Sequence, residues 1–429
     1  MMALGKLWPG AGLLVGRFSW TVADQVGVSL GNFLVNVQLA RGLSLGEYGL
    51  FALLLWAFIG LQIVNSSLVF YPFTLRFVTA PVGQRATLLS TSLLLQVMTS
   101  LQLSTLLLAG LLAFGHSDLV LPVIAYFLLW QTQEATRRGL MADFRFRRAS
   151  IGDAVTYIGQ PVLVAILASR GSLTLANSLY AMAVACGLGA LLNASQLALS
   201  RPLLDCRRLI KDHWLIGKWC LLNNYLLYFN VGIFLWSLAA VGGAAAAAPF
   251  QAIDNVGNLL NPVIYGLGNV IPQSAAHALK GGKGSFGAWR EARVYVLLGL
   301  APTLAYCAVA LLAPDLLLRA FYGANSPYLD LTVPVQLFAL AWPMRYAGEL
   351  ICAFFYGVEA GRLAVLSNIA AMVAAIVALP LVLPLGLIGI CLTLVGTSFV
   401  RMAVGYYALT KLIRADEPAD RQVVVQGEA

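Results

Sequence analysis

Two opposite charges stand one helical turn apart inside an apolar stretch of the sequence. Arg345 and Glu349 lie in the stretch 330–357, which is long enough to cross a lipid bilayer. An arginine can bind the phosphate or carboxylate of a ligand through two parallel hydrogen bonds. Glu349 can instead neutralise the arginine within the same helix. A contact to substrate or ion and an intrahelical ion pair are therefore both open for this pair.

Two aspartates, Asp24 and Asp254, lie in other apolar stretches. A carboxylate there is costly unless it faces protein or water. Because a buried carboxylate can bind and release a proton or a sodium ion, we expect both to be candidate ion-coupling residues. A hydrogen bond that ties two helices together explains them equally well.

Amide side chains accompany these charges at helical spacing. In 18–40 the polar residues recur every three or four positions, which places them on one face of a helix. Tight packing between helices is the alternative for any one of them, and Arg76 also fits a helix end at the membrane surface. The candidate substrate-binding residues are Gln25, Asn32, Asn36, Gln62, Arg76, Asn255, Asn258, Arg345 and Glu349.

The apolar stretches that carry these residues indicate an all-α polytopic membrane protein. Of the 429 residues, 60% are hydrophobic and only 10% are charged, whereas a soluble domain carries roughly 25% charged residues. In lipid only helices or closed barrels satisfy their own backbone, and these runs are too long and continuous for barrel strands. They predict about twelve spans, near 18–40, 46–71, 86–114, 118–137, 149–169, 173–199, 212–238, 244–273, 291–313, 330–357, 361–384 and 386–412.

The distribution of lysine and arginine supports this count. If the spans alternate and the N-terminus is cytoplasmic, 23 of the 27 fall on the cytoplasmic side, Arg401 among them. Only Arg41, Arg170 and Arg319 fall outside, and Arg345 is left inside a span. The positive-inside rule gives this asymmetry and places both termini in the cytoplasm. The net charge of +9 is then explained by anionic lipids, so no nucleic-acid partner is expected.

The polar stripes indicate two repeated halves. They occupy the first, second and fourth spans and recur in the seventh, eighth and tenth, an offset of six. We therefore predict two pseudo-symmetric lobes of six helices, 1–205 and 206–414, followed by a cytoplasmic tail at 415–429. An even offset gives the two lobes the same orientation in the membrane.

No motif in the sequence points to an enzyme. The six cysteines are scattered, there are three histidines, and no HExxH, GxSxG or paired-carboxylate motif occurs. We therefore predict no catalytic residue, no metal ligand and no cofactor.

The junction after the first span resembles a known family. The segment Ala40-Arg41-Gly42-Leu43-Ser44-Leu45-Gly46-Glu47-Tyr48-Gly49-Leu50-Phe51-Ala52-Leu53 is similar to the first-to-second helix junction of polysaccharide flippases. These belong to the multidrug/oligosaccharidyl-lipid/polysaccharide exporter superfamily, whose length and six-plus-six layout fit nearly the whole chain. The resemblance implies a V-shaped pair of lobes, with the first, second, seventh and eighth helices lining a cavity. One departure is that the first span carries Asp24 and amides rather than an arginine, unlike the lipid II flippase branch.

The resemblance implies a flippase that moves polyprenyl-pyrophosphate-linked oligosaccharide from the cytoplasmic to the periplasmic leaflet by alternating access. Such a protein serves surface polysaccharide biosynthesis in the bacterial inner membrane. Its expected partners are the lipid-linked oligosaccharide, membrane lipids and other polysaccharide-assembly proteins, with H⁺ or Na⁺ as candidate coupling ions. An ion-coupled multidrug exporter of the same superfamily is the alternative, since the spans offer both signs of charge. A membrane enzyme of the polysaccharide pathway is a weaker third, because the outer connections are short.

Overall fold

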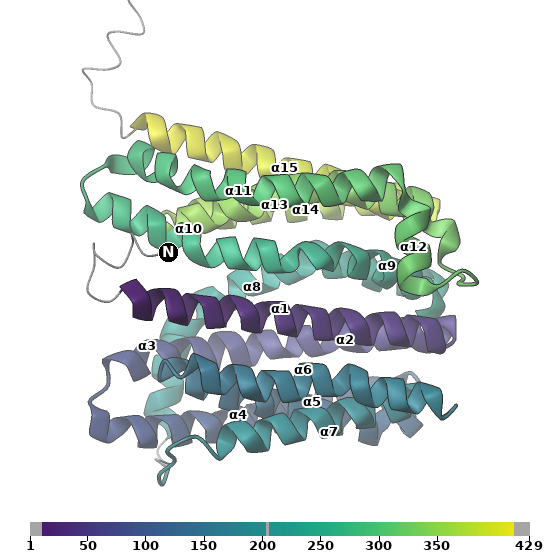
Figure 1. Ribbon diagram of the computed structural model, residues 1–429, viewed down its shortest axis with the longest axis horizontal. Coiled ribbons are helices and arrows are strands. Elements are labelled where there is room, and N and C mark those ends of the chain that lie inside the picture. The colour runs from purple at the N-terminus through teal and green to yellow at the C-terminus, as the bar shows by residue number, and fades with distance from the viewer. Residues whose placement is uncertain (1–10, 203–205, 416–429) are drawn as a thin grey trace, which may run out of the picture. The chain divides into compact units, whose positions relative to one another are not determined.

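The computed structural model describes the backbone of residues 11–202 and 206–415, and every regular element in these ranges is a helix (Figure 1). The α-helices are α1 (Ala11–Gly42), α2 (Leu45–Asn65), α3 (Tyr71–Thr79), α4 (Val82–Ala113), α5 (Val120–Ala142), α6 (Phe146–Ser169), α7 (Leu175–Ala194), α8 (Cys206–Gly242), α9 (Ala244–Gly257), α10 (Asn261–Lys280), α11 (Gly284–Leu312), α12 (Pro314–Tyr322), α13 (Thr332–Gly357), α14 (Gly361–Val382) and α15 (Gly386–Ala415). The single-turn elements are the π-helix η1 (Ser66–Phe70) and the 3-10 turns η2 (Ser117–Leu119), η3 (Asn258–Leu260), η4 (Leu329–Leu331) and η5 (Leu383–Leu385).

Each predicted span corresponds to one helix or to one interrupted helix. The second span is α2, η1 and α3, and the eighth is α9, η3 and α10, while the short α12 stands between the ninth and tenth. The prediction of an all-α polytopic protein with about twelve spans is therefore confirmed. By length and composition alone, seven stretches of the described chain are apolar enough to cross a membrane, the last of which covers both α14 and α15.

The remaining spans are α1, α5, α9–α10 and α13. These are four of the six spans for which the sequence predicts a polar stripe. Their polar side chains lower the apolar content of helices that are otherwise long enough to span a bilayer. The spans with the weakest hydrophobic signal are thus those that hold most of the candidate site residues.

Contacts divide the chain into two compact units. Unit 1 comprises Met1–Tyr228 and Gly242–Ala248, and unit 2 comprises Phe229–Val241 and Pro249–Ala429. The division falls within α8. The predicted lobe limits, 1–205 and 206–414, stay a prediction, and the predicted tail at 415–429 lies outside the described residues beyond Ala415.

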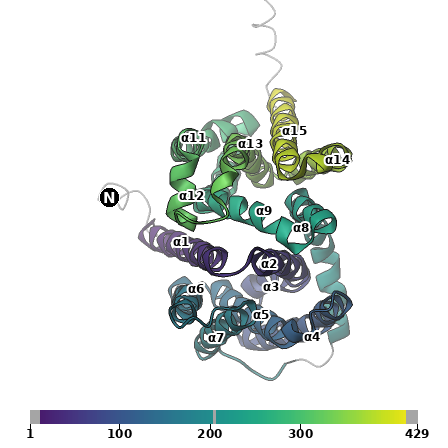
Figure 2. The ribbon, with the colours of Figure 1, turned by 90° about the vertical axis from the view of Figure 1, so that its right-hand side faces the viewer.

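The packing inside the two units repeats. In unit 1, α5 packs on α7, α6 on α7, and α4 on α5. In unit 2 the helices six spans later pair in the same way, since α13 packs on α15, α14 on α15, and α11 on α13. Figure 2, which looks along the helices, shows these neighbours within each unit. The repeat agrees with the two pseudo-symmetric lobes that the stripes predict.

The second span of each half is interrupted next to a proline. Pro72 follows η1 and Pro262 follows η3, and each lacks the N–H that would bond the carbonyl four residues earlier. In the first case that carbonyl belongs to Leu68, and Nδ1 of His213 in α8 lies 3.0 Å from it. Because a carbonyl only accepts, Nδ1 is the protonated nitrogen of this ring. The Leu68 carbonyl at the helix break therefore accepts a hydrogen bond from a side chain of another helix.

Further contacts attach the first part of α8 to the second span of unit 1. Nδ2 of Asn224 donates to Oγ of Ser67 at 3.0 Å, and the hydroxyl of Tyr228 donates to the carbonyl of Trp56 at 2.9 Å. A Cβ at Gly217 would lie 2.4 Å from the carbonyl oxygen of Ser67, so only glycine permits this approach. These contacts explain why α8 up to Tyr228 belongs to unit 1.

The junction that carries the family resemblance is a helix cap followed by a close helix approach. The hydroxyl of Ser44 accepts from the N–H of Glu47 at 3.3 Å, and the Glu47 carboxylate accepts from the N–H of Ser44 at 3.2 Å. This capping box starts α2. A Cβ at Gly49 would lie 1.8 Å from the carbonyl oxygen of Ala244, so the glycine is required for packing within unit 1.

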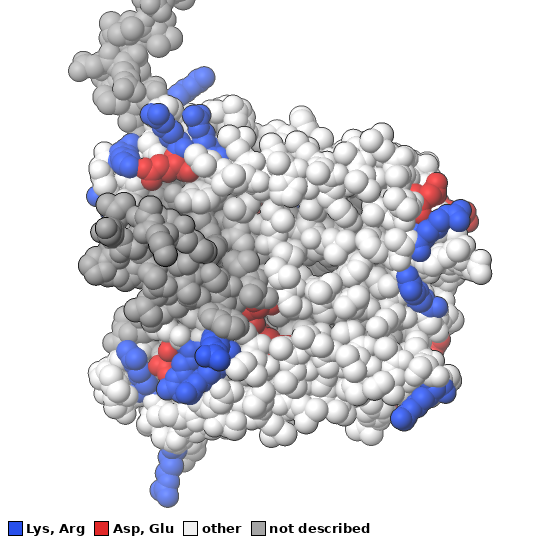
Figure 3. Space-filling view, in the orientation of Figure 1, with Lys and Arg blue, Asp and Glu red and all other residues white. Residues whose placement is uncertain are grey.

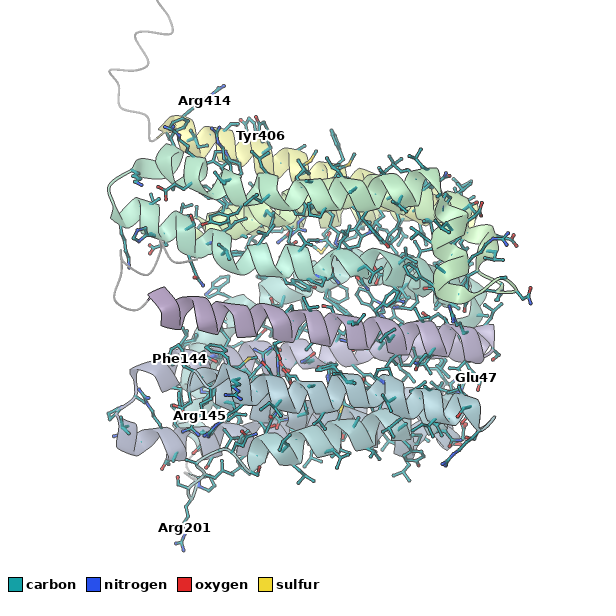
Figure 4. The ribbon with its side chains drawn as sticks, viewed as in Figure 1. Glu47, Phe144, Arg145, Arg201, Tyr406 and Arg414 are labelled. Carbon is teal, nitrogen blue, oxygen red and sulfur yellow. The ribbon has the colours of Figure 1, made fainter. Side chains whose placement is uncertain are left out.

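Charged side chains gather toward the ends of the helices and are sparse along their middle on the face drawn in Figure 3. Within unit 1, Glu47 lies toward one end of the helices, while Arg145 and Arg201 lie toward the other (Figure 4). This distribution suits helices whose middle is in hydrocarbon, where an exposed charge is costly. The chain is a multi-pass membrane protein.

Candidate functional site

Three carboxylates meet one guanidinium inside unit 1. Arg137 of α5 donates to Asp24 of α1 at 2.8 Å and to Glu134, one turn earlier on α5, at 3.2 Å. It also pairs closely with Asp153 of α6. The side chains of Asp24 and Asp153 are each 2% exposed and that of Glu134 is 6% exposed. Arg138 pairs with the second oxygen of Glu134 at 2.6 Å.

This unit 1 cluster holds one more carboxylate than it holds arginines. Asp24 and Asp153 also act on each other electrostatically, and Oδ1 of Asp24 has no hydrogen-bond partner. Two neighbouring carboxylates that cannot both ionise readily share one proton. The cluster therefore has the chemistry to take up and release a single proton.

Of the unit 1 residues predicted from the sequence, Asp24 alone belongs to this cluster. Asn36 is buried and its amide donates to the backbone carbonyl of Asn32 at 3.0 Å, whereas the side chain of Asn32 is exposed. The other predicted residues of this unit are partly buried: Gln25, Gln62 and Arg76.

Glu134 and Asp153 were not predicted from the sequence. Asp153 lies inside the predicted span 149–169 and could have been selected by the criterion that selected Asp24 and Asp254, a carboxylate within an apolar stretch. Arg137 was counted among the cytoplasmic charges, but its side chain is only 15% exposed and is enclosed by carboxylates.

The amide of Asn65 bridges tightly packed helices, which is the alternative to substrate binding that the sequence left open for the amides. Asn65, fully buried in α2, donates through Nδ2 to Oγ of Ser100 at 2.9 Å and to Oε1 of Gln131 at 3.0 Å. Ser100 lies on α4 and Gln131 on α5, so this one side chain connects three spans of unit 1. Such bonds tie helices together in lipid, where hydrophobic burial gives little drive for association.

Unit 2 holds a second group of charges. Nη1 of Arg401 in α15 donates to Glu349 of α13 at 2.7 Å, and its Nε donates to Oδ1 of Asn368 in α14 at 2.8 Å. The side chain of Arg401 is 11% exposed. Its assignment to the cytoplasmic charges is therefore wrong, because it lies in the middle of α15 and is enclosed by α13 and α14. Of the two alternatives for Arg345 and Glu349, the intrahelical ion pair is not formed among the described residues, where Glu349 is bound by Arg401.

Arg345 is left without a carboxylate partner. Among the described residues no Asp or Glu forms an ion pair with its guanidinium, and its buried Nη1 has no hydrogen-bond partner. The guanidinium lies over the indole of Trp342, 5.0 Å from the ring centroid. Its charge acts electrostatically on Asp254, Tyr265 and Glu349 without an ion pair or hydrogen bond to any of them.

The predicted residues of the eighth span lie near this arginine. Asp254 is 6% exposed and accepts a hydrogen bond from Nδ2 of Asn258 at 3.0 Å. Asn258 in turn accepts from Asn261 at 2.9 Å, and Asn255 is buried beside them in α9. The structure thus gathers Asp254, Asn258 and Arg345 in one part of unit 2, and their roles stay predictions.

An apolar pocket lies next to Arg345, which it adjoins through Trp342. It is lined by residues of α9, α11 and α13, including Ile253, Val256, Phe338 and Trp342. Trp342 therefore borders the pocket and also supports the guanidinium of Arg345. In the part of the chain that the structure describes, no group of three His, Cys, Asp or Glu side chains could hold a metal ion.

The sequence matches no family model and no curated protein, but solved structures match nearly the whole chain. A multidrug resistance MATE family transporter of the MOP superfamily in an inward-facing conformation shares 18% identity at a TM-score of 0.71, covering 93% of this chain and 95% of that chain. An outward-facing transporter of the same description shares 16% at 0.68, covering 93% and 96%. A MOP superfamily transporter from Pyrococcus furiosus, described as having a binding pocket of reverse polarity that suggests a different function, shares 17% at 0.65, covering 93% and 96%. At these identities the likeness establishes the fold.

Proposed function

We propose that this chain, which has the fold of the MOP superfamily transporters, is an ion-coupled exporter that works by alternating access. The unit 1 cluster carries the proposal, because it is a buried group able to bind a proton and is built from three separate spans. The multidrug transporters among the matching structures favour an exporter of organic solutes over a flippase. The two lobes proposed to alternate are 1–205 and 206–414, with both termini in the cytoplasm.

Coupling follows from how Arg137 ties α1 to α5 and α6 through Asp24 and Asp153. When one of these carboxylates takes up a proton it loses its charge and much of its attraction to the guanidinium, so α1 is bound less firmly. Breaking a buried ion pair costs about 3–5 kcal/mol. A change of that order shifts a two-state equilibrium by more than about a hundredfold. Cation binding in unit 1 can therefore bias the conformation of the helix bundle.

The test is efflux from proteoliposomes under an imposed pH or sodium gradient, with fluorescent dyes of either charge as substrates. Asp24→Asn and Asp153→Asn should each abolish gradient-driven efflux, because each removes an ionisable group from the cluster. Asp118→Asn is the matched control, since it makes the same change at an exposed aspartate of unit 1. Gradient-driven efflux that persists in both cluster variants would remove the cluster from coupling.

A second candidate function is the flippase for polyprenyl-pyrophosphate-linked oligosaccharide. The unpartnered guanidinium of Arg345 favours it, because pyrophosphate can fill the vacant hydrogen bond of Nη1. The capped junction that resembles those of polysaccharide flippases is a second support. In this case the partners are the lipid-linked oligosaccharide and other polysaccharide-assembly proteins of the inner membrane. Deleting the gene should then stop surface polysaccharide and leave lipid-linked units in the inner leaflet, whereas lost dye efflux with intact polysaccharide favours the exporter.

A further inference from the structure

We propose that Arg401 sets the charge preference of unit 2: by binding Glu349 it leaves Arg345 as an unneutralised cation that receives the anionic group of an amphiphilic substrate. This inference rests on the proposed transport function and names the class of substrate. Arg401 acts as a positioning residue, because its guanidinium is engaged with protein groups on three sides and Arg345 makes the contact.

Arg345 and Arg401 both lie within reach of Glu349 and compete for it. Arg345 and Glu349 are four residues apart on α13, the spacing at which opposite charges pair along a helix. Arg401 nevertheless takes the carboxylate at 2.7 Å, with Oδ1 of Asn368 at 2.8 Å fixing its guanidinium from a third helix. Sγ of Cys352 lies 3.9 Å from Nη2 of Arg401. Glu349 is thereby neutralised from the α15 side.

The pairing of Glu349 with Arg401 leaves Arg345 without an acceptor among the described residues. Its Nη1 is buried and unpartnered, and the indole of Trp342 lies under its guanidinium at 5.0 Å. Asp254 is the remaining carboxylate near it, and its Oδ2 accepts from Asn258. A guanidinium that is partly buried without an acceptor gains most from an anionic oxygen, which can take two parallel N–H bonds.

Trp342 also borders a small apolar pocket. Gly257 lets the indole lie against α9, since a Cβ there would come within 2.3 Å of Nε1 of Trp342. Ile253, Val256 and Phe338 complete an apolar lining. The space between these side chains holds little more than a water molecule, so the apolar part of a ligand anchored on Arg345 lies against this lining and does not enter it. A phosphate or carboxylate bound by Arg345 thus has an apolar surface beside it on the Trp342 side, which favours an anionic amphiphile over a bare anion.

The test measures binding to the purified full chain in detergent by isothermal titration. The probes are farnesyl pyrophosphate, inorganic pyrophosphate and the cation tetraphenylphosphonium. The wild-type chain should bind farnesyl pyrophosphate more tightly than inorganic pyrophosphate and should bind the cation most weakly. Arg345→Gln should weaken farnesyl pyrophosphate by about ten- to a hundredfold, the worth of one or two charge-assisted hydrogen bonds. Equal affinities for both pyrophosphates would remove the apolar pocket from the site, and preference for the cation would overturn the proposal.

The role of Arg401 is tested by releasing Glu349 and then removing it. Arg401→Gln should weaken farnesyl pyrophosphate nearly as much as Arg345→Gln does, because the freed Glu349 pairs with Arg345. The double variant Arg401→Gln with Glu349→Gln should regain the wild-type affinity to within about threefold, and adding Arg345→Gln to it should abolish the gain. Arg414→Gln, an exposed arginine near the end of α15 (Figure 4), is the control and should change nothing.

The double variant has no buried unpaired charge at this position and is decisive even if Arg401→Gln alone does not fold. Weak binding by a folded double variant would overturn the proposal, because Glu349 can no longer neutralise Arg345 in that variant. The outcome is separable from the proposed function. If the role of Arg345 is refuted, Arg345→Gln leaves anion binding unchanged while efflux still depends on Asp24. If the proposed function is refuted, anion binding still depends on Arg345 while efflux does not depend on Asp24.

Discussion

Replacing Arg137 by glutamine should destabilise unit 1 by more than any other single removal of an arginine there. The variant leaves Asp24 and Asp153, each 2% exposed, without their cationic partner, while Glu134 keeps Arg138. Removing one partner of a buried pair costs about 3–5 kcal/mol, because the remaining charge is buried and uncompensated. The midpoint of thermal unfolding should fall on the order of 10 °C. Protonation neutralises the orphaned carboxylates, so the deficit should shrink in acid.

The assay is thermal unfolding of the purified chain in detergent, followed by intrinsic fluorescence at neutral and acidic pH. Arg138→Gln is the matched control, because its side chain is 35% exposed and Glu134 retains Arg137. A partly exposed ion pair contributes about 1 kcal/mol or less, so the control should unfold nearly as the wild type does. If Arg137→Gln and Arg138→Gln unfold at the same temperature, the cluster does not have the structural role assigned to it.

Two further predictions concern topology and packing. Substituted-cysteine accessibility should place both termini in the cytoplasm, together with the loops 138–150, 201–213 and 280–290. Labelling of any of these segments from outside the cell would contradict the twelve-span arrangement. Gly217→Ala should lower stability by about 1–3 kcal/mol, because its Cβ would meet the carbonyl of Ser67 at 2.4 Å. The same change at Gly83, where a Cβ meets nothing within 4 Å, is the control, and equal unfolding midpoints would refute the close approach.

The spans could be predicted from the sequence because the bilayer imposes their length on the chain. The stretch 330–357 became α13 (Thr332–Gly357) and 361–384 became α14 (Gly361–Val382), with boundaries within two residues. Asp24 was also found in this way, since a carboxylate in hydrocarbon requires a partner. The alternative for Asp24, a hydrogen bond that ties two helices together, also describes this contact, because its partner Arg137 lies on another helix.

The ion-pair partners of the buried charged residues could not be predicted, because helical periodicity gives the face on which a residue lies and not its neighbour on another helix. The sequence left Glu349 open to an ion pair with Arg345 on its own helix, whereas Arg401, 52 positions later in the chain, binds it. Arg401 was grouped with the cytoplasmic charges although it stands in the middle of the predicted span 386–412. Sorting the charges by side of the membrane assigned Arg401 to a loop, although the predicted span boundaries already placed it inside a helix.

The most direct test of the account is proton exchange by the purified chain when substrate binds. In a weakly buffered detergent solution, adding a transported dye to the wild-type chain should change the pH of the medium. The reason is that substrate and proton bind preferentially to different conformations, so binding of one releases the other. Asp24→Asn should abolish this exchange while Asp118→Asn leaves it unchanged, since only the first residue belongs to the buried cluster. Proton exchange of equal size in the wild type and in Asp24→Asn would contradict coupling through unit 1.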